Sequence, residues 1–225
     1  MFYAFVKLFF HPLVRIYLRL RTEGAGKVPR GGAALIAANH ASFLDPIVLG
    51  SACPRKIHFI VLQSMYDWWR LRWFYWGMQT IPVRAEEADP RAVKQALSRL
   101  RRGNLVGIFP EGGRSHDGVL LPPKPGAALL AAASGVPVIP AYIEGAWASW
   151  KPGTLFPLPG RVRVRFGDPI HFSRDREKRR DRAELEVFSR RLMQAIAELG
   201  QEAGHEGGAD GGGERAAAAR PPRIP

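Results

Sequence analysis

The chain has 225 residues, with 33 Lys and Arg against 20 Asp and Glu, and a formal net charge of +13. Its 46% hydrophobic and 24% charged residues exclude an intrinsically disordered chain. The one cysteine, Cys53, excludes an internal disulfide. The excess positive charge, together with six Trp and twelve Phe, suggests an anionic and partly apolar partner, either a phospholipid surface or nucleic acid.

The first 20 residues are strongly apolar, but basic residues recur at every fourth position: Lys7, His11, Arg15 and Arg19. This spacing places the basic side chains on one helical face. It predicts an amphipathic helix in the membrane interface that buries Phe2, Phe5, Phe9, Phe10 and Leu13. Pro12 splits the helix or starts a second one. An alternative is a helix that packs on the core of the protein. The internal charges disfavour a signal peptide.

Short apolar runs alternate with helical patterns along the rest of the chain. Buried strands are predicted at residues 33–38, 56–62, 80–83, 105–109 and 136–143, and a half-exposed edge strand at 161–166. Helices are expected at residues 45–51, 64–76, 90–101, 126–133 and 181–199. This alternation predicts an α/β fold, a mainly parallel twisted sheet with helices on both faces.

Three parts of the chain follow from these patterns. Residues 1–24 form the N-terminal membrane-associating segment, and residues 25–199 form the folded domain. Residues 200–225 are rich in Gly, Ala and Pro and have almost no apolar bulk, so we expect a disordered tail.

Polar residues follow two of the predicted strands at their carboxyl ends, where ligands bind in parallel sheets. His40 and Asp45 follow the strand at 33–38, and such a pair can act as a general base and the carboxylate that orients it. Alternatively, Ser42 and Asp45 form a capping box at a helix start.

The second junction follows the strand at 105–109. Gly112 and Gly113 allow backbone N–H groups to approach an anion, and Arg114 offers a planar fork that matches phosphate. These residues are also compatible with an ordinary surface turn. Ser115 is discounted as a hydrolase nucleophile, because a nucleophile elbow needs glycine at position 117, where Asp117 stands.

Four segments together resemble the glycerolipid acyltransferase family, which includes 1-acylglycerol-3-phosphate acyltransferases. They are residues 39–45 (NHASFLD), similar to the family's NHxSxxD block, 77–84 (GMQTIPVR), 109–115 (FPEGGRS), similar to FPEGTRS, and 136–140 (VPVIP). All four occur in the family's order. Gly113 departs from the family's usual threonine, and Lys124 in KPGA is a looser match.

The resemblance implies that residues 25–199 are an acyltransferase catalytic domain. His40 would be the general base and Asp45 its partner, with Arg84 and Arg114 as phosphate ligands. The third of the four family segments, residues 109–115, is called here the third block. Glu111 and Gly112 would shape its loop, the third-block loop, with Gly113 and Lys124 beside the substrate, and Glu111 could contact the acceptor.

The implied reaction moves an acyl group from acyl-CoA or acyl carrier protein, as co-substrate, to a lysophospholipid, most plausibly 1-acylglycerol-3-phosphate. Another lysolipid or glycerol-3-phosphate is the alternative acceptor. The six histidines show no metal-ligand spacing and Cys53 stands alone, so we expect no metal. No nucleic-acid recognition motif is present, so we expect no nucleic acid as a partner. We also expect no cofactor, and a peripheral or monotopic protein on the cytoplasmic face of a membrane. A different class, a non-catalytic basic module that binds membranes or RNA, is the rival interpretation.

An aromatic and basic segment at residues 66–76 holds four of the six tryptophans. Trp and Tyr favour the membrane–water boundary, so a second membrane-contact patch is one expectation. The other is that Trp69, Trp73 and Trp76, which share a helical face, pack in the core.

Overall fold

The computed structural model describes residues 2–67, 69–84, 89–151, 154, 156–172 and 181–206. These residues form a seven-stranded sheet in the order β1-β7-β6-β2-β5-β3-β4. The strands are β1 Arg21–Glu23, β2 Ala34–Ala38, β3 Ile57–Leu62, β4 Ile81–Val83, β5 Leu105–Ile108, β6 Val138–Glu144 and β7 Arg163–Phe166. Neighbouring strands are parallel except for β6 and β7, which are antiparallel.

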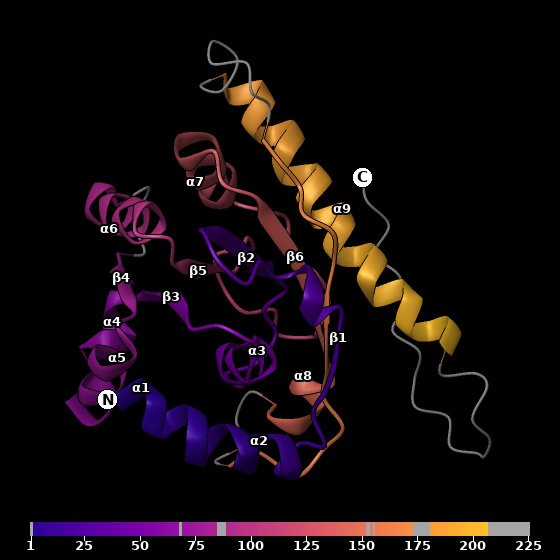
Figure 1. Cartoon of the computed structure of the whole chain (residues 1–225). Helices are drawn as coiled ribbons and strands as arrows, with labels where there is room; N and C mark the ends of the chain where they lie inside the picture. The colour runs from indigo at the N-terminus through magenta and orange to yellow at the C-terminus, as the bar shows by residue number, and fades with distance from the viewer. Residues whose placement is uncertain are drawn as a thin grey trace.

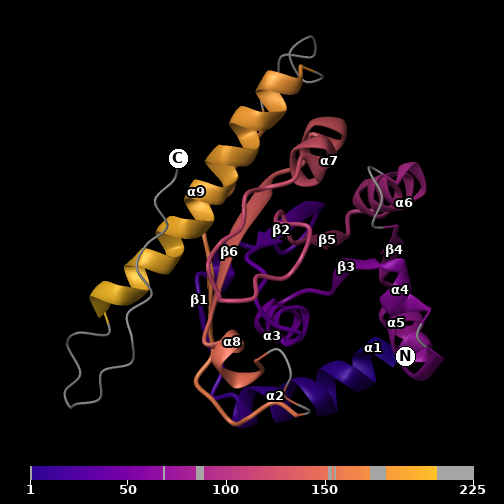
Figure 2. The same cartoon turned by 180° about the vertical axis from the view of Figure 1, so that it is seen from behind.

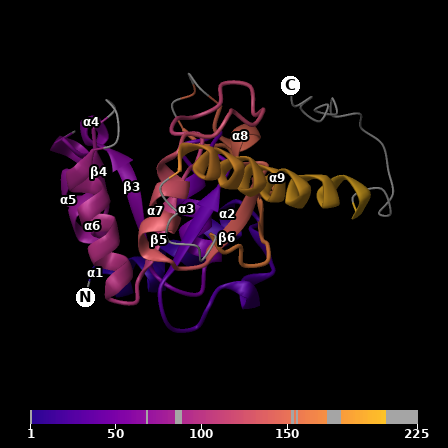
Figure 3. The same cartoon turned by 90° about the horizontal axis from the view of Figure 1, so that it is seen from above.

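Helices cover both faces of this sheet (Figures 1 and 2). One face carries α2 (His11–Tyr17), α3 (Asp45–Ala52) and α8 (Ala146–Ser149). The other face carries α6 (Pro90–Arg101), α7 (Gly126–Ser134) and α9 (Arg182–Glu206), and the view from above shows α7 and α9 in front of the sheet (Figure 3). Ala34 and Ile36 of β2 belong to the core under α3, and Leu35 to the core under α7. This alternation buries β2 on both sides, which explains its uninterrupted apolar sequence.

The predicted α/β class with a mainly parallel sheet is therefore confirmed. The prediction of an edge strand at 161–166 is wrong, because β7 lies between β6 and β1. Arg165 is only 4% exposed, and its guanidinium contacts Glu23 at 2.6 Å and Glu144 at 3.3 Å. The three-residue strand β1 covers the edge that β7 would otherwise present.

Two helical boundaries also differ from expectation. The helix expected at 64–76 is divided into α4 (Gln63–Tyr66) and α5 (Trp69–Met78). Helix α9 continues to Glu206, so residues 200–206, which we had assigned to the tail, are helical. The remaining part of the predicted tail, 207–225, lies outside the described residues.

The N-terminal segment forms one helical rod, made of α1 (Phe2–Phe5), a π-helical segment η1 (Val6–Phe10) and α2. Pro12 lies in the first turn of α2, where proline is tolerated. Val6, His11 and Val14 are buried against the domain. The large apolar side chains on the opposite side are exposed: Phe5, Leu8, Phe9, Leu13 and Ile16. The basic face therefore packs toward the protein and the apolar face points outward.

A second exposed apolar patch lies on α5, where Trp73 is 62% and Trp76 is 74% exposed. These two side chains are therefore not core residues, while the side chain of Trp69 lies outside the described part of the structure. Helix α5 contacts α1 (Figure 1), so the two apolar surfaces adjoin. Among the described helices, none is long and apolar enough to cross a bilayer.

Candidate active site

His40 and Asp45 lie together where the polypeptide leaves β2 and enters α3. Nδ1 of His40 is 2.8 Å from Oδ2 of Asp45, which is 1% exposed. Because a carboxylate can only accept a hydrogen bond, this contact places the imidazole proton on Nδ1. Nε2 of His40 is then left with the lone pair that a general base needs. The ring keeps access to solvent, since 18% of the side chain is exposed.

The capping box that was the alternative is formed only in part, because α3 begins at Asp45 and its N-cap, Leu44, has no side-chain capping bond. Oδ2 of Asp45 accepts the backbone N–H groups of Ala41 and Ser42, each at 2.7 Å, and the Ser42 hydroxyl accepts the N–H of Leu44 at 3.2 Å. One carboxylate oxygen therefore fixes both the loop and the imidazole. These backbone contacts make the orientation of His40 rigid, because Asp45 cannot turn away without leaving two buried N–H groups unpaired.

The third-block loop also holds both the backbone and the ring of His40. Oε1 of Glu111 accepts the backbone N–H of His40 at 2.7 Å, and the N–H of Ser115 donates to the carbonyl of His40 at 2.8 Å. The ring of Phe109 stacks on the His40 imidazole, with centroids 4.0 Å apart and an interplanar angle of 16°. The two predicted junctions therefore form one site.

Glu111 differs from the expectation that it could contact the acceptor. It is 4% exposed, and its second oxygen accepts the N–H of Leu121 at 2.8 Å, so both oxygens are used by the backbone. Burial raises the pKa of the Glu111 carboxyl to about 7, although the N–H groups of Leu121 and His40 lower it. Its contacts are those of a residue that holds the loop and not of a substrate ligand.

Arg114 lies on the same side of the molecule as the His40 loop. Its guanidinium carbon is 3.5 Å from the centre of the Phe43 ring, and Phe43 stands three residues after His40. Burial lowers the pKa of Arg114, and the nearby Asp45 carboxylate opposes that shift. A guanidinium stacked on an aromatic face keeps its in-plane N–H groups available for oxygen ligands.

The two loop glycines are in different situations. Gly112 has a φ of +67°, and a Cβ there would lie 2.5 Å from Cδ of Lys124, so the Lys124 stem packs directly on the glycine. The backbone N–H of Lys124 also donates to the carbonyl of Pro110 at 2.7 Å. Gly113 has no atom within 4 Å of a built Cβ. The Cβ of the threonine that the family usually has at this position therefore meets no neighbouring atom.

Arg84 directly follows β4 and is exposed, and its backbone N–H donates to Asp89 at 3.3 Å. β4 lies three places from β2 in the sheet, about 14 Å at the usual strand spacing. The structure therefore places Arg84 at the same edge of the sheet as His40 but brings it into no described contact with the other candidate residues.

Two residues that position the site had no assigned role in the sequence interpretation. The Asn39 side chain forms two hydrogen bonds with the backbone of Ile143, at 3.0 and 2.7 Å, and so ties the His40 loop to β6. Phe109 supports the imidazole, as described above. Phe109 stands in the third block, and that signal could have identified it.

Ser115 is 2% exposed and its hydroxyl donates to Asp117 at 2.9 Å, so this proton is already engaged by a carboxylate. Within the described part of the chain, no three His, Cys, Asp or Glu side chains lie close enough together to hold a metal ion.

Comparison with known proteins identifies the family of this chain. A family model described as Acyltransferase matches residues 19–144, and the chain belongs to this family of acyl-transferring enzymes. The matched segment contains both halves of the site, since it includes His40 and Arg114.

Among characterised relatives, a 1-acyl-sn-glycerol-3-phosphate acyltransferase of Bacillus subtilis is 28% identical over 77% of this chain and 86% of its own length. The chloroplastic enzyme LPAT1 of Arabidopsis thaliana, with the same activity in its name, is 32% identical over 70% of this chain but only 45% of its own length. The crystal structure of the 1-acyl-sn-glycerophosphate acyltransferase PlsC from Thermotoga maritima is similar in fold, with a TM-score of 0.70 and 24% identity. The match covers 89% of this chain and 79% of that structure.

Proposed function

We propose that this protein transfers a fatty acyl group from a thioester, acyl-CoA or acyl carrier protein, to the free hydroxyl of 1-acylglycerol-3-phosphate, which yields phosphatidic acid. The observation that carries this proposal is the His40–Asp45 pair, held at 2.8 Å beside the Arg114 loop. The names of the relatives support the choice of acceptor.

In the proposed reaction, Nε2 of His40 takes the proton of the acceptor hydroxyl as its oxygen attacks the thioester carbonyl. The new C–O bond forms, the C–S bond breaks, and the imidazolium returns the proton to the departing thiolate. Asp45 stabilises the imidazolium through Nδ1. General-base catalysis of this kind contributes about 10²–10⁴-fold, and the positioning of both substrates supplies more.

The acceptor phosphate would be bound by the basic residues of the third-block region. Arg114 presents a guanidinium held flat on Phe43, and Lys124 emerges beside Gly112. We also keep Arg84 as a phosphate ligand in this proposal. It directly follows β4, at the same edge of the sheet as His40.

We further propose that the exposed apolar surface of the N-terminal rod and α5 lies in the membrane interface, on the side from which a lysophospholipid arrives. Five apolar side chains of the rod are more than half exposed, from Phe9 at 59% to Ile16 at 77%. Each such side chain contributes about 1.5–3 kcal/mol when it enters an apolar phase. Trp73 and Trp76 extend the same surface.

The test is product analysis with purified protein, acyl-CoA and a panel of acceptors: 1-acylglycerol-3-phosphate, lysophosphatidylcholine and glycerol-3-phosphate. We expect mass spectrometry to detect phosphatidic acid and thiol release that depends on the first acceptor. Preference for another acceptor would replace the proposed substrate while keeping the chemistry. Absence of thiol release with every acceptor, and with acyl carrier protein as the donor, would instead favour a non-catalytic binding module.

A further inference from the structure

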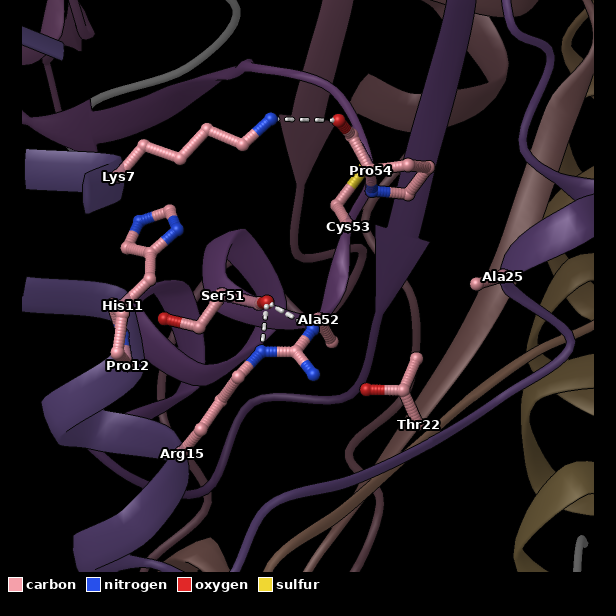
Figure 4. Close-up of a pocket in the computed structure, with 10 residues that line it drawn as sticks. All are labelled: Lys7, His11, Pro12, Arg15, Thr22, Ala25, Ser51, Ala52, Cys53 and Pro54. Atoms are coloured by element: carbon pink, nitrogen blue, oxygen red, sulfur yellow. Dashed lines mark hydrogen bonds between the residues drawn. The ribbon is translucent and has the colours of Figure 1, made fainter. Parts of the chain in front are cut away.

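A pocket of about 430 Å³ lies between the N-terminal rod and the C-terminal end of α3. Figure 4 shows Lys7, His11 and Arg15 on the rod, opposite Ser51, Cys53 and Pro54. Pro12, Thr22, Ala25 and Ala52 complete the lining, and none of these described lining residues is acidic. Asp45 is the first residue of α3, so the pocket lies at the opposite end of this helix from the candidate active site.

Two hydroxyl groups of the pocket lack a hydrogen-bond partner in the described structure, Oγ of Ser51 and Oγ1 of Thr22. Ser51 is only 3% exposed. In Figure 4 its hydroxyl points toward the rod, and that of Thr22 points toward Arg15. A buried hydroxyl without a partner costs about 1–3 kcal/mol. Both oxygens are closed off from solvent, so each side chain must turn about χ1 to donate to a ligand oxygen in the pocket, and that hydrogen bond would recover the cost.

The cations of the pocket are partly engaged but not neutralised. Arg15 donates from Nε and Nη2 to the carbonyl of Ser51, at 3.1 and 2.7 Å, and Lys7 donates to the carbonyl of Pro54 at 3.2 Å. These contacts offset the partial negative charge at the C-terminal end of α3. Both side chains have further N–H donors, because ammonium has three and guanidinium five.

The remaining titratable groups of the pocket are neutral near pH 7. Burial raises the pKa of the Cys53 thiol to about 11. Burial, together with Lys7 and Arg15, lowers the pKa of His11 below its usual value near 6.5. The net charge that the pocket offers is therefore positive, and no carboxylate among its described lining residues offsets it.

We propose that this pocket binds the phosphate group of an anionic phospholipid, with Lys7, Arg15 and the hydroxyls of Ser51 and Thr22 as donors. The choice of a lipid over a free anion rests on the proposed function, which places the outer face of the rod in the membrane interface. The inner face, and hence the pocket, then lies at the depth of the lipid headgroups. The bound lipid would hold the rod in place at a site separate from the reacting substrates.

The experiment is NMR titration of the full-length protein with isotopically labelled histidine, using dihexanoyl phosphatidate below its micelle concentration as the soluble probe. His11 is assigned by His11→Gln, and His40 by His40→Ala. We expect a saturable shift of the His11 signal and a raised His11 pKa, because a bound anion stabilises the imidazolium. Phosphatidate bound in the candidate active site would shift the NMR signal of His40 instead, so the two histidine signals report on the two sites separately.

Two variants test the donors. Arg15→Gln should weaken the binding seen at His11 by about tenfold or more, the usual value of a charge-assisted hydrogen bond. Ser51→Ala should weaken it several-fold while preserving the contact of Arg15, which is made to the backbone carbonyl. The matched controls are Arg19→Gln, two residues after the end of the rod and outside the pocket lining, and Ser189→Ala, another buried hydroxyl without a partner. Both control variants should bind dihexanoyl phosphatidate as tightly as the wild type does.

An unchanged His11 signal at saturating probe, or equal binding by the wild type and both donor variants, would overturn the proposal. Inorganic phosphate that binds as tightly as phosphatidate would overturn the assignment to a lipid. Because the titration contains neither a bilayer nor an acyl donor, its failure is distinguishable from failure of the proposed acyl transfer.

Discussion

Three hydrogen bonds converge on one oxygen of Asp45, from His40, Ala41 and Ser42. The catalytic pair and the capping box were alternative interpretations of His40, Ser42 and Asp45, yet the oxygen that orients His40 also accepts the N–H of Ser42, which is one half of a capping box. The spacing could not reveal this, because both contacts need a tight loop whose backbone N–H groups turn toward the same point. The second half of the site, around Glu111, depends on contacts between residues 71 positions apart and could be anticipated only from the family resemblance.

Glu111 gives the site a pH dependence that a stability measurement can detect. Its folded pKa of about 7 lies above the usual value near 4.5. Between these values the native state holds a proton that the unfolded state has released, so the unfolding free energy contributed by this group falls as pH rises. Relative to Glu111→Gln, the wild type should be less stable at pH 8 than at pH 5. Urea unfolding at both pH values measures this difference, and a constant difference would contradict the raised pKa.

A substitution of Arg114 tests whether this residue binds the phosphate of the acceptor. We expect Arg114→Gln to raise the acceptor KM by about tenfold or more, since it removes a charge-assisted contact, and to change kcat little. Arg91→Gln, an exposed arginine at the start of α6, controls for the loss of one positive charge. Steady-state kinetics with varied acceptor distinguish the two variants. An unchanged acceptor KM in Arg114→Gln would remove this residue from the phosphate site.

At the scale of the elements, strands with continuous apolar sequence were predictable, and short or polar ones were not. β2 and β5 are buried on both faces, and their apolar runs identify them. β1 has the sequence Arg-Thr-Glu and forms a strand only because β7 pairs with it. The alternating arginines of β7 indicated an edge, but partners distant in sequence, Glu23 and Glu144, neutralise Arg165.

The third-block loop offers a matched pair of glycine substitutions. Gly112→Ala should destabilise the protein by about 1 kcal/mol or more, because its φ of +67° disfavours any Cβ and the Lys124 stem occupies that space. Gly113→Ala should change stability by less than about 0.5 kcal/mol, since nothing lies near its built Cβ. Thermal unfolding compares the two. Equal losses would show that the left-handed conformation at Gly112 does not shape this loop.

At the scale of the whole molecule, the N-terminal rod joins an apolar outer face to a basic inner face. The sequence predicted that the basic residues share one helical side. It did not show that this side would contact the domain, because the partners of Arg15 and Lys7 are backbone carbonyls at the end of α3. Every residue has a backbone carbonyl, so the sequence cannot indicate which of them bind Arg15 and Lys7.

The apolar outer face should be required for binding to lipid vesicles. We expect Ile16→Glu to weaken binding to phosphatidylcholine–phosphatidylglycerol vesicles by about tenfold or more, the value of one exposed isoleucine that enters an apolar phase. Val187→Glu is the matched control, because Val187 is 52% exposed on α9, on the other face of the sheet. Vesicle flotation measures both. If Ile16→Glu bound normally, or both variants lost binding equally, the rod would not be the membrane-binding face.

The proposed acyl transfer depends above all on the imidazole of His40. The most direct measurement is thiol release from acyl-CoA with 1-acylglycerol-3-phosphate, comparing wild type, His40→Ala and His116→Ala. His116 is an exposed histidine in the third-block loop and serves as the control. We predict that His40→Ala loses about 10²-fold or more of the rate, with an unchanged fold by circular dichroism, and that His116→Ala remains active. A His40→Ala protein that releases thiol at the wild-type rate would contradict the proposed mechanism.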